Sequence, residues 1–321
     1  MAMQQPVLAL DIGGTKLAVA MVTPDGNSHG FLSEPTHKQR GPEQVIAHLF
    51  EMGQRSIAAA GVGNPGAVGI SCGGPLDSTA GILTHPLHLP GWINIPIVDL
   101  TQSEFGVPAV VENDATAAVR GEHRFGAARG HDTALYLTIS TGVGGGSVVD
   151  GRLHRGAAGN GGEFGHVTVQ RGGRPCECGR RGCLEAYVSG TNIARRAREA
   201  LSSSEVPSIL RESTPVRAQD VAAAAASGDT LARDIWDETT ALLGQAITDL
   251  VNIFEPNIVV LGGGVTRSGA QLLDPVRHIV RTTAMPPAAA HVDVVLAALG
   301  DEVCVVGAGA LALDLMEATR V

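Results

Sequence analysis

The sequence predicts an α/β fold that contains the same small unit twice. Short apolar runs typical of buried strands alternate with longer stretches of helical periodicity along the chain. A Gly-rich turn between two such strands occurs at residues 11–16 and again at residues 140–146, and each second strand is followed by an Asp-Gly pair. When Leu8 is set against Leu135, Gly14 aligns with Thr141. Gly-rich turns between strands are common, so the predicted duplication depends on both halves together.

Length and composition limit what this fold can be and do. The 321 residues are 44% hydrophobic, which is enough for one large or two medium domains with cores of their own. The net charge of −9 argues against nucleic-acid binding, which depends on clustered Lys and Arg. The one cationic stretch, residues 171–181, also contains Cys176 and Cys178 and lies just before Cys183, so we expect it to be a folded loop.

The N-terminal residues and the apolar runs predict a cytoplasmic protein. Residues 1–10 lack a charged leader, and no window approaches the ~20 apolar residues that a membrane helix needs. In the cytoplasm, cysteines are expected to be metal ligands or core residues instead of disulfides. We expect Cys72 and Cys304 to be core residues.

The first half of the chain contains four expected strands and two expected helices. The first helix is expected because Ile46, Leu49 and Ile57 fall on one side of a helical period. In chain order we expect strands at residues 7–11 and 17–22, a helix at 42–60, strands at 67–71 and 108–112, and a helix at 115–122.

The second half repeats this alternation. Its clearest helix begins near Leu231, carries an apolar stripe through Ile235 and Leu242, and ends before Pro256. In chain order we expect strands at residues 133–139 and 147–149, an Ala-rich helix at 222–226, a helix at 231–254 and a strand at 258–261.

The turn Asp11-Ile-Gly-Gly-Thr-Lys16 is the first candidate phosphate site. Glycines let backbone N–H groups converge on a phosphate. Asp11 at a strand end could hold Mg²⁺, and Lys16 could neutralise phosphate charge. Because a strand follows the turn, the motif is neither a Walker loop nor a dinucleotide fingerprint. An ordinary hairpin turn is the alternative interpretation.

Two further Gly-rich segments could contact the same nucleotide. Ser140-Thr-Gly-Val-Gly-Gly-Gly146 occupies the corresponding place in the second half, so a nucleotide could lie between the two turns. Gly262-Gly-Gly264 follows a buried strand, where α/β proteins bind ligands, and could present a flat surface to a purine. The alternative for these three glycines is close packing of the strand against a helix.

The pair Asn113-Asp114 falls where an expected strand gives way to an expected helix. Both residue types favour the N-cap position. A helix N-terminus also favours the ionised carboxylate, which a general base needs before it can accept a hydroxyl proton. The two interpretations, helix cap and catalytic base, are compatible.

The strongest local motif places three cysteines within eight residues. Glycines between Cys176, Cys178 and Cys183 permit the sharp turns that direct three sulfurs to one point. His166 completes a tetrahedral Cys₃His zinc site, and a closed site of this kind is structural. The alternative is a group of unliganded thiols, and the C-x-C spacing disfavours a redox pair.

Two acidic residues flank the cysteine motif, Glu163 before it and Glu185 directly after it. A zinc site could hold both carboxylates at a polar pocket, where each would accept hydrogen bonds from sugar hydroxyls. Solvated surface glutamates are the alternative.

Together these motifs resemble the ROK family of bacterial sugar kinases over nearly the whole chain. Residues 11–16 resemble its first phosphate motif, and Glu112-Asn-Asp-Ala115 resembles its catalytic motif. Residues 69–77 and 89–92 resemble its sugar-side segments. The long family signature is matched by Gly142 to Gly156, Gly162-Glu-Phe-Gly-His166 and Cys176-x-Cys-Gly-x-x-Gly-Cys-Leu-Glu185.

The resemblance implies an actin-like ATPase (ribonuclease H-like) fold with two α/β domains and a cleft between them. The smaller domain would comprise residues 1–117, completed by a C-terminal helix at about 304–321. Residues 118–303 would form the larger domain, which carries the zinc site. A homo-oligomer, either a dimer or a tetramer, is also implied.

The resemblance also implies roles for single residues. Asp114 would be the base, and His166 would have one ring nitrogen on zinc and the other facing the sugar. The implied sugar-binding residues are Gly74, Asn113, Asp114, Glu163, His166 and Glu185. From these motifs and the Gly-rich segments together, the expected ATP-binding residues are Asp11, Gly13, Gly14, Thr15, Lys16, Thr141, Gly142, Gly262, Gly263 and Gly264.

We therefore expect transfer of the ATP γ-phosphoryl group to the 6-hydroxyl of glucose, with Mg²⁺ and structural Zn²⁺ as cofactors. N-acetylmannosamine, N-acetylglucosamine, mannose and fructose are alternative acceptors. Three departures from the family pattern concern Thr116 and His88, where many members have Asn, and Ser140, where Gly is more usual. The first two leave the identity of the sugar open.

The rival from another functional class is a sugar-responsive transcriptional repressor of the same family. Such proteins carry a winged-helix domain ahead of the phosphate motif, whereas ten residues precede Asp11 here. We expect ATP and a sugar as partners, and neither a nucleic acid nor a membrane.

Overall fold

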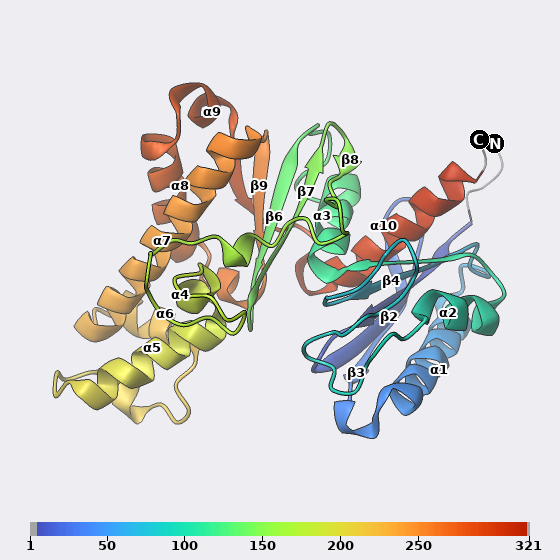
Figure 1. The fold of residues 1–321 in the computed structure, drawn as a ribbon, viewed down its shortest axis with the longest axis horizontal. Coiled ribbons are helices and arrows are strands. Elements are labelled where there is room, and N and C mark those ends of the chain that lie inside the picture. Colours follow the sequence, from blue (N-terminus) through green and yellow to red (C-terminus); the bar gives the residue numbers. More distant parts are fainter. Residues whose placement is uncertain (1–4, 320–321) are drawn as a thin grey trace.

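Two five-stranded mixed sheets form the framework of the computed structural model, which describes residues 5–319 (Figure 1). The strand order is β3-β2-β1-β4-β5 in the first sheet and β10-β9-β6-β7-β8 in the second. The strands of the first sheet are β1 (Val7–Ile12), β2 (Lys16–Val22), β3 (Ser28–Pro35), β4 (Val68–Cys72) and β5 (Ala109–Asn113). Those of the second are β6 (Ala134–Ile139), β7 (Val143–Val149), β8 (Arg152–Leu153), β9 (Ile258–Gly262) and β10 (Asp293–Leu296).

Helices cover both sheets. The α-helices are α1 (Pro42–Ala60), α2 (Ile97–Phe105), α3 (Asp114–Phe125), α4 (Glu185–Val188), α5 (Gly190–Ser203), α6 (Ala218–Ala226), α7 (Thr230–Phe254), α8 (Ala270–Thr283), α9 (Pro286–His291) and α10 (Val303–Ala318). Short 3₁₀ helices lie at Lys38–Arg40, Phe164–His166, Ile209–Glu212, Gly264–Ser268 and Gly300–Glu302. No helix among residues 5–319 is both long and apolar enough to cross a membrane.

The predicted duplication is visible in the topology. In the first sheet β1, β2 and β3 pair antiparallel, while β4 and β5 extend the other side of β1 in parallel. The second sheet repeats this arrangement, with β6, β7 and β8 antiparallel and β9 and β10 parallel to β6. The α/β fold with one repeated unit is therefore confirmed, and β1 corresponds to β6.

Some predicted boundaries are wrong. The Gly-rich turn expected at 140–146 is shorter, because β7 begins at Val143 and takes the later glycines into the sheet. The strands β3, β8 and β10 and the helices α2, α4, α5, α8 and α9 have no counterpart among the predicted elements. The edge strand β3 alternates between partly buried and exposed residues, so it lacks the apolar run by which the buried strands were recognised.

The helix α10 packs on the first sheet, although it follows the second sheet in the chain. Val305, Ala308 and Ala312 are buried against the face of β1 and β2. α10 also contacts α3, and a Cβ on Gly307 would overlap the carbonyl of Ala117. Glycine therefore lets the two helices approach through their backbones between the halves (Figure 1). The smaller domain was expected to include residues 1–4 and 320–321, and these residues lie outside the part of the chain that the structure describes.

Parallel pairing brings three strand ends to one edge of the first sheet. The register pairs Asp11 of β1 with Ser71 of β4, and Cys72 of β4 with Asn113 of β5. The chain therefore leaves β1, β4 and β5 at the same edge, where α/β proteins bind ligands.

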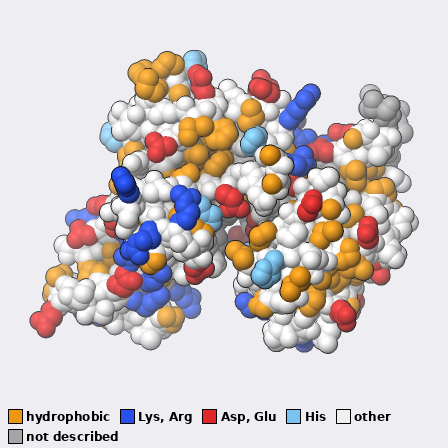
Figure 2. All heavy atoms as spheres, in the orientation of Figure 1, with side chains coloured by type: hydrophobic (Ala, Val, Ile, Leu, Met, Phe, Trp, Pro, Cys, Tyr) orange, Lys and Arg blue, Asp and Glu red, His pale blue; other side chains and the backbone are white. Residues whose placement is uncertain are grey.

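The two halves face each other across this edge. The buried carboxylate of Glu112 on β5 pairs with Arg155, which follows β8, at 2.5 Å. Glycines in β7 bring α3 against the second sheet, since a Cβ on Gly146 would lie 2.7 Å from the carbonyl oxygen of Ala115. Figure 2 shows that the surface is hollowed between the halves.

Candidate active site and metal centre

Asp11 lies at the end of β1 and is 8% exposed. Ser71 Oγ on the adjacent strand donates a hydrogen bond to Asp11 Oδ1. Burial raises the pKa of Asp11 to about 6, against the opposing effects of the Ser71 hydrogen bond and the Lys16 charge, and the nearby Asp114 adds to the rise. Burial destabilises the ionised form of this carboxylate, and a bound cation would offset that cost, so the group is well suited to bind a cation.

The turn after Asp11 is held by backbone hydrogen bonds. Gly13 N–H donates to the carbonyl of Lys16 at 3.1 Å, and Thr36 Oγ donates to the carbonyl of Gly13 at 2.6 Å. Thr15 and Lys16 are exposed at the tip. The structure therefore brings Asp11, Gly13, Gly14, Thr15 and Lys16 together in one tight turn at the edge where β1, β4 and β5 end.

Asn113 and Asp114 connect β5 to α3. Asn113 is the N-cap, and its Oδ1 accepts from the backbone N–H of Ala115 at 3.0 Å and of Thr116 at 3.4 Å. Its Nδ2 faces Gly74, where a Cβ would lie 3.5 Å away. Asp114 Oδ1 accepts from Ala115 N–H at 2.8 Å. The amide group of Asn113 and the second oxygen of Asp114 therefore remain for a ligand.

The electrostatics of Asp114 differ from the sequence-based expectation. Burial raises the pKa of Asp114, and this effect exceeds the lowering by the Ala115 N–H and by His88. The helix N-terminus favours the carboxylate form, as expected, but it does not decide the direction of the shift. A raised pKa brings a carboxylate closer to the range of an efficient general base.

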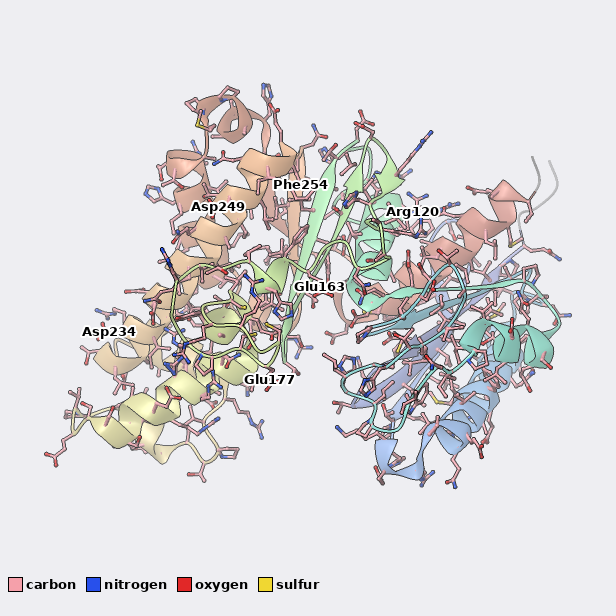
Figure 3. All side chains as sticks on the ribbon, viewed as in Figure 1. Arg120, Glu163, Glu177, Asp234, Asp249 and Phe254 are labelled. Carbon is pink, nitrogen blue, oxygen red and sulfur yellow. The ribbon has the colours of Figure 1, made fainter. Side chains whose placement is uncertain are left out.

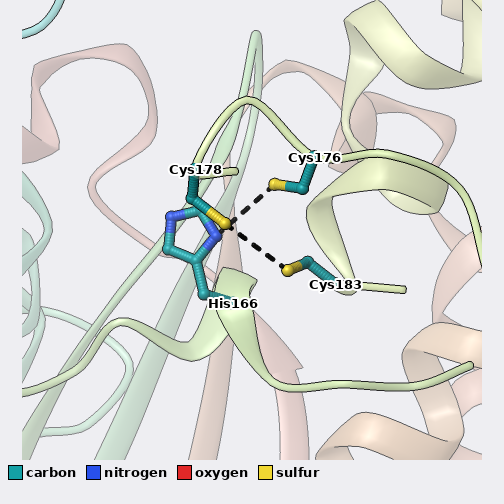
Figure 4. A group of neighbouring side chains, drawn as sticks. All are labelled: His166, Cys176, Cys178 and Cys183. Carbon is teal, nitrogen blue, oxygen red and sulfur yellow. Dashed lines mark hydrogen bonds between the residues drawn. The ribbon is translucent and has the colours of Figure 1, made fainter. Parts of the chain in front are cut away.

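The four predicted metal ligands lie together (Figure 4). The ligand atoms of His166, Cys176, Cys178 and Cys183 all lie within 4.8 Å of one another. Cys176 Sγ is 3.7 Å from His166 Nδ1, and Cys178 Sγ is 3.7 Å from Cys183 Sγ. A tetrahedron with Zn–S bonds of about 2.3 Å has S···S edges of about 3.8 Å. The chemistry and spacing of these four residues therefore fit zinc.

His166 connects this cluster to the cleft. Its Nδ1 faces the sulfurs, while its Nε2 lies 3.8 Å from a carboxylate oxygen of Glu163. The Glu163 side chain is 57% exposed, and it lies beside the gap between the halves (Figure 3). Partial burial raises the pKa of Glu163, His166 lowers it, and Asp114 and Glu185 raise it further. The structure therefore brings Glu163, His166, Glu185 and Asp114 into electrostatic contact.

Glu185 links the metal cluster to the second Gly-rich turn. One carboxylate oxygen accepts a hydrogen bond from Val143 N–H at 2.9 Å, and the other lies 3.7 Å from Cys176 Sγ. A Cβ on Gly142 would lie 2.6 Å from the first oxygen. Part of the hydrogen-bonding capacity of Glu185 is therefore used to hold the turn that contains Thr141 and Gly142.

A cavity of about 580 Å³ opens beside the second turn. Ser140 and Thr141 line it, together with Gly190 at the start of α5 and Gly264 after β9. Its volume falls within the usual range for small-molecule sites. All of its lining residues belong to the second half of the chain, including Arg217, Gln219, Trp236 and Gln271, which were not predicted as site residues.

The three glycines after β9 have different surroundings. A Cβ on Gly262 would overlap the hydroxyl of Tyr136, and one on Gly263 would lie 2.5 Å from the carbonyl oxygen of Ile139. Close packing thus accounts for Gly262 and Gly263. Gly264 has no atom within 4 Å of such a Cβ and lines the cavity. The predicted purine surface is therefore reduced to Gly264 and residues on α6, α7 and α8.

Three comparisons relate the chain to known proteins. It matches the model of the ROK family over residues 7–315. It is 36% identical over 309 residues to a glucokinase of Thermotoga maritima, which covers 95% of this chain and 96% of that protein. The fold matches a ROK hexokinase from Thermus thermophilus with a TM-score of 0.82 at 34% identity, over 99% of this chain and 100% of that one. It matches a ROK family glucokinase from Streptomyces griseus, in complex with glucose and AMPPNP, with a TM-score of 0.80 at 33% identity, over 96% and 99%.

Proposed function

The chain belongs to the ROK family and has the actin-like ATPase fold, and we propose that it transfers the γ-phosphoryl group of ATP to the 6-hydroxyl of glucose. One observation carries this proposal. Asp114 lies at the edge that bears the Asp11 turn, and it interacts electrostatically both with Asp11 and with Glu163 across the cleft. A base in that position lies between a phosphate site and a sugar site.

The reaction needs one proton acceptor and accurate positioning. Asp114 accepts the proton of the sugar 6-hydroxyl, and the sugar oxygen forms a bond to the γ-phosphorus. The bond between that phosphorus and the β,γ-bridging oxygen breaks, and ADP leaves with the electron pair. The raised pKa of Asp114 makes it a stronger proton acceptor than an exposed aspartate.

The remaining sugar hydroxyls are proposed to contact groups that the protein leaves available. Asn113 Nδ2 can donate, whereas Glu163 and the free lone pairs of Glu185 accept. His166 Nε2 faces the same side as Glu163. Gly74 lies next to Asn113, so its missing side chain leaves room for the sugar ring.

The nucleotide is proposed to occupy the cavity beside the second turn and to extend toward the first. Thr141, Gly142 and Gly264 would contact it from the second half. Backbone N–H groups of Gly14 and Thr15 would contact the phosphates, with Lys16 near them. Asp11 would hold Mg²⁺, which neutralises charge on the β- and γ-phosphates.

The cysteine cluster is proposed to hold one structural zinc ion through His166, Cys176, Cys178 and Cys183. Four protein ligands leave no open position, so the ion supplies rigidity and no step of the reaction. Through His166 and Glu185 this rigidity extends to the sugar side and to the second turn.

We extend the proposal to the organisation of the protein. A smaller domain of residues 1–117 completed by α10, and a larger domain of residues 118–303, agree with the packing of α10 on β1 and β4. A cytoplasmic location agrees with the free cysteines of the described chain, and the absence of a nucleic-acid partner agrees with the net charge of −9. The proposal of a homo-oligomer follows from membership of the family alone.

Phosphotransfer by the purified protein tests the function. With ATP and Mg²⁺, we expect glucose 6-phosphate to form with a higher kcat/KM for glucose than for N-acetylmannosamine, N-acetylglucosamine, mannose or fructose. Polyphosphate in place of ATP tests the donor. Absence of product with every sugar, or specific DNA binding at physiological salt, would refute the proposal.

A further inference from the structure

The loop between β4 and α2 holds His88 over the catalytic edge. Leu89 and Trp92 directly after it are fully buried, and the backbone N–H of Trp92 donates to the carbonyl of Leu89 at 3.2 Å. On the other side of His88, the N–H of Leu87 donates to the carbonyl of Gly74 at 3.2 Å. The loop is therefore fixed at both ends, and His88 has a defined position.

The imidazole ring of His88 covers two glycines that belong to different strand ends. A Cβ on Gly73, which follows β4, would overlap Nε2 and Cε1 of the ring. A Cβ on Gly14, in the first Gly-rich turn, would lie 2.8 Å from His88 Cβ and 3.4 Å from its Cδ2. Any larger residue at either glycine would displace the ring. The ring therefore occupies the space that the missing side chains of Gly73 and Gly14 leave open.

His88 has hydrogen-bonding capacity that the protein does not use. Neither ring nitrogen forms a hydrogen bond or an ion pair with another residue in the range 5–319, and His88 is exposed to solvent. His88 interacts electrostatically with Asp114 on α3, and Asp114 in turn interacts with Asp11, which also feels the charge of Lys16. A ring that lies over the turns of Gly14 and Gly73, with nitrogens that no protein group uses, is arranged to contact a ligand held at those turns.

We propose that Nε2 of His88 donates a hydrogen bond to the phosphoryl group that is transferred. The proposal rests on the proposed function, in which the turn of Gly14 contacts the phosphates and Asp114 takes the proton. His88 contacts that turn at Gly14 and interacts electrostatically with that base, so we place it beside the path of the phosphorus atom. His88 transfers no proton, and it stabilises the charge on the equatorial oxygens during transfer.

The alternative role for His88 is to fill space above the two glycines. A space-filling ring would contribute to the shape of the loop and would affect stability or sugar affinity. A hydrogen bond to the reacting group is made most strongly in the transition state, so its loss lowers kcat. The division of an effect between kcat and KM therefore separates the two roles.

The test uses His88→Ala and His88→Gln in the purified, metal-loaded protein. Because a hydrogen bond to a charged group contributes substantially, we expect His88→Ala to lower kcat about 10- to 100-fold. The KM values for glucose and ATP should change less than about threefold. The Gln side chain can place an N–H near the position of Nε2, so His88→Gln should recover part of the lost kcat.

His85→Ala is the matched control. His85 is exposed on the same loop and has no assigned role, so its kcat and thermal unfolding temperature should equal those of the parent. Because His88 is exposed, its variants should also unfold at the temperature of the parent.

Three outcomes would overturn the assignment of His88. These are an unchanged kcat in His88→Ala, a loss confined to the KM for glucose, and equal losses in the Ala and Gln variants, which would indicate ring shape instead of hydrogen bonding. An inactive parent would refute the proposed function, whereas an active parent with an equally active His88→Ala would refute only this inference.

Discussion

The two Gly-rich hairpins have the same topology and different chemistry. The hairpin β1–β2 carries Asp11 near its turn, and Asp11 is paired in register with Ser71 of the neighbouring strand. In the equivalent place on β6, Thr138 pairs with Gly262 of β9. The second hairpin therefore has no carboxylate of its own at this position.

The second hairpin obtains a carboxylate from elsewhere in the chain. Glu185 begins α4 directly after the cysteine loop, and it accepts a hydrogen bond from Val143 N–H at the second turn. Its other oxygen lies 3.7 Å from Cys176 Sγ. In the first half a strand positions the acid directly. In the second half the acid is positioned by the loop of residues 166–183, which carries the four proposed metal ligands and is called the metal loop below.

This difference indicates how a duplicated fold can divide its tasks. The first edge contains two carboxylates whose burial raises their pKa values, so it holds charge at some cost in stability. At the second edge, the end of the second sheet that carries the second Gly-rich turn, Glu185 lies beside the Cys₃His cluster. A metal ion in that cluster would restrict the loop without the burial of a reacting charge. Reaction chemistry is thus expected at the first edge and ligand positioning at the second.

The largest expected effect tests the first edge. Asp114→Asn should lower kcat about 10²- to 10⁴-fold, because the amide cannot accept the hydroxyl proton. In the parent, activity should also fall as the pH drops through the raised pKa of Asp114, since the protonated carboxyl is no longer a base. Initial rates of glucose 6-phosphate formation at several pH values measure both effects.

The control for Asp114→Asn is Asp99→Asn, an exposed aspartate in the first turn of α2. The control variant should keep the kcat of the parent. If Asp114→Asn turned over at a near-normal rate while folded, the reaction chemistry would not depend on the first edge, and the comparison between the halves would fail.

The second prediction concerns the metal loop. Cys183→Ser should reduce bound zinc and lower the free energy of unfolding by roughly 3 kcal/mol or more, because Cys183 is fully buried at the cluster. Loss of the cluster should also raise the KM for glucose about tenfold, since His166 joins the cluster to Glu163. Metal analysis, urea denaturation and steady-state kinetics measure these three quantities.

Cys304→Ser is the control, because Cys304 lies outside the cluster and is only partly buried. It should retain zinc and the KM for glucose. If Cys183→Ser lost zinc but kept both stability and KM, the metal loop would not position the second edge, and that half of the comparison would be wrong.

The sequence predicted the parts of this molecule in which local pattern and tertiary environment agree. The helices α1 and α7 follow a clear apolar period, and their predicted bounds differ from the structure by at most one residue. The clustering of His166 with three cysteines was predictable because three of the four residues lie within eight positions, so that a short loop determines their spacing. Such features depend little on the rest of the fold.

Other features depend on residues far apart in the chain. The cavity beside the second turn combines Thr141, Arg217 and Gln271 from separate segments, and no local pattern joins them. The packing of Gly262 against Tyr136 is likewise invisible until β6 and β9 are paired. The direction of the pKa shift of Asp114 also requires the tertiary structure, because burial outweighs the helix N-terminus that the sequence suggests.

The smallest expected effect concerns stability at the first edge. Asp11 has a pKa of about 6 in the folded protein and 3.8 as its ordinary value. Because the folded-state pKa is raised, the contribution of Asp11 to stability is fully present below about pH 4 and is lost as the pH rises through 6. Asp11→Asn should therefore raise the free energy of unfolding at pH 7 by about 1–3 kcal/mol and leave it unchanged near pH 4.

Urea denaturation of the parent and of Asp11→Asn at pH 4, 5, 6 and 7 measures this difference, and Asp99→Asn again serves as the control. The amide resembles the neutral carboxyl in shape and can still accept the hydrogen bond from Ser71. The same variant should lose phosphotransfer, because it removes the proposed Mg²⁺ ligand. If Asp11→Asn is more stable and less active than its parent, the buried charge of Asp11 lowers stability but is needed for activity. If the variant and the parent are equally stable at pH 7, the first edge has no such stability cost, and this difference between the halves is absent.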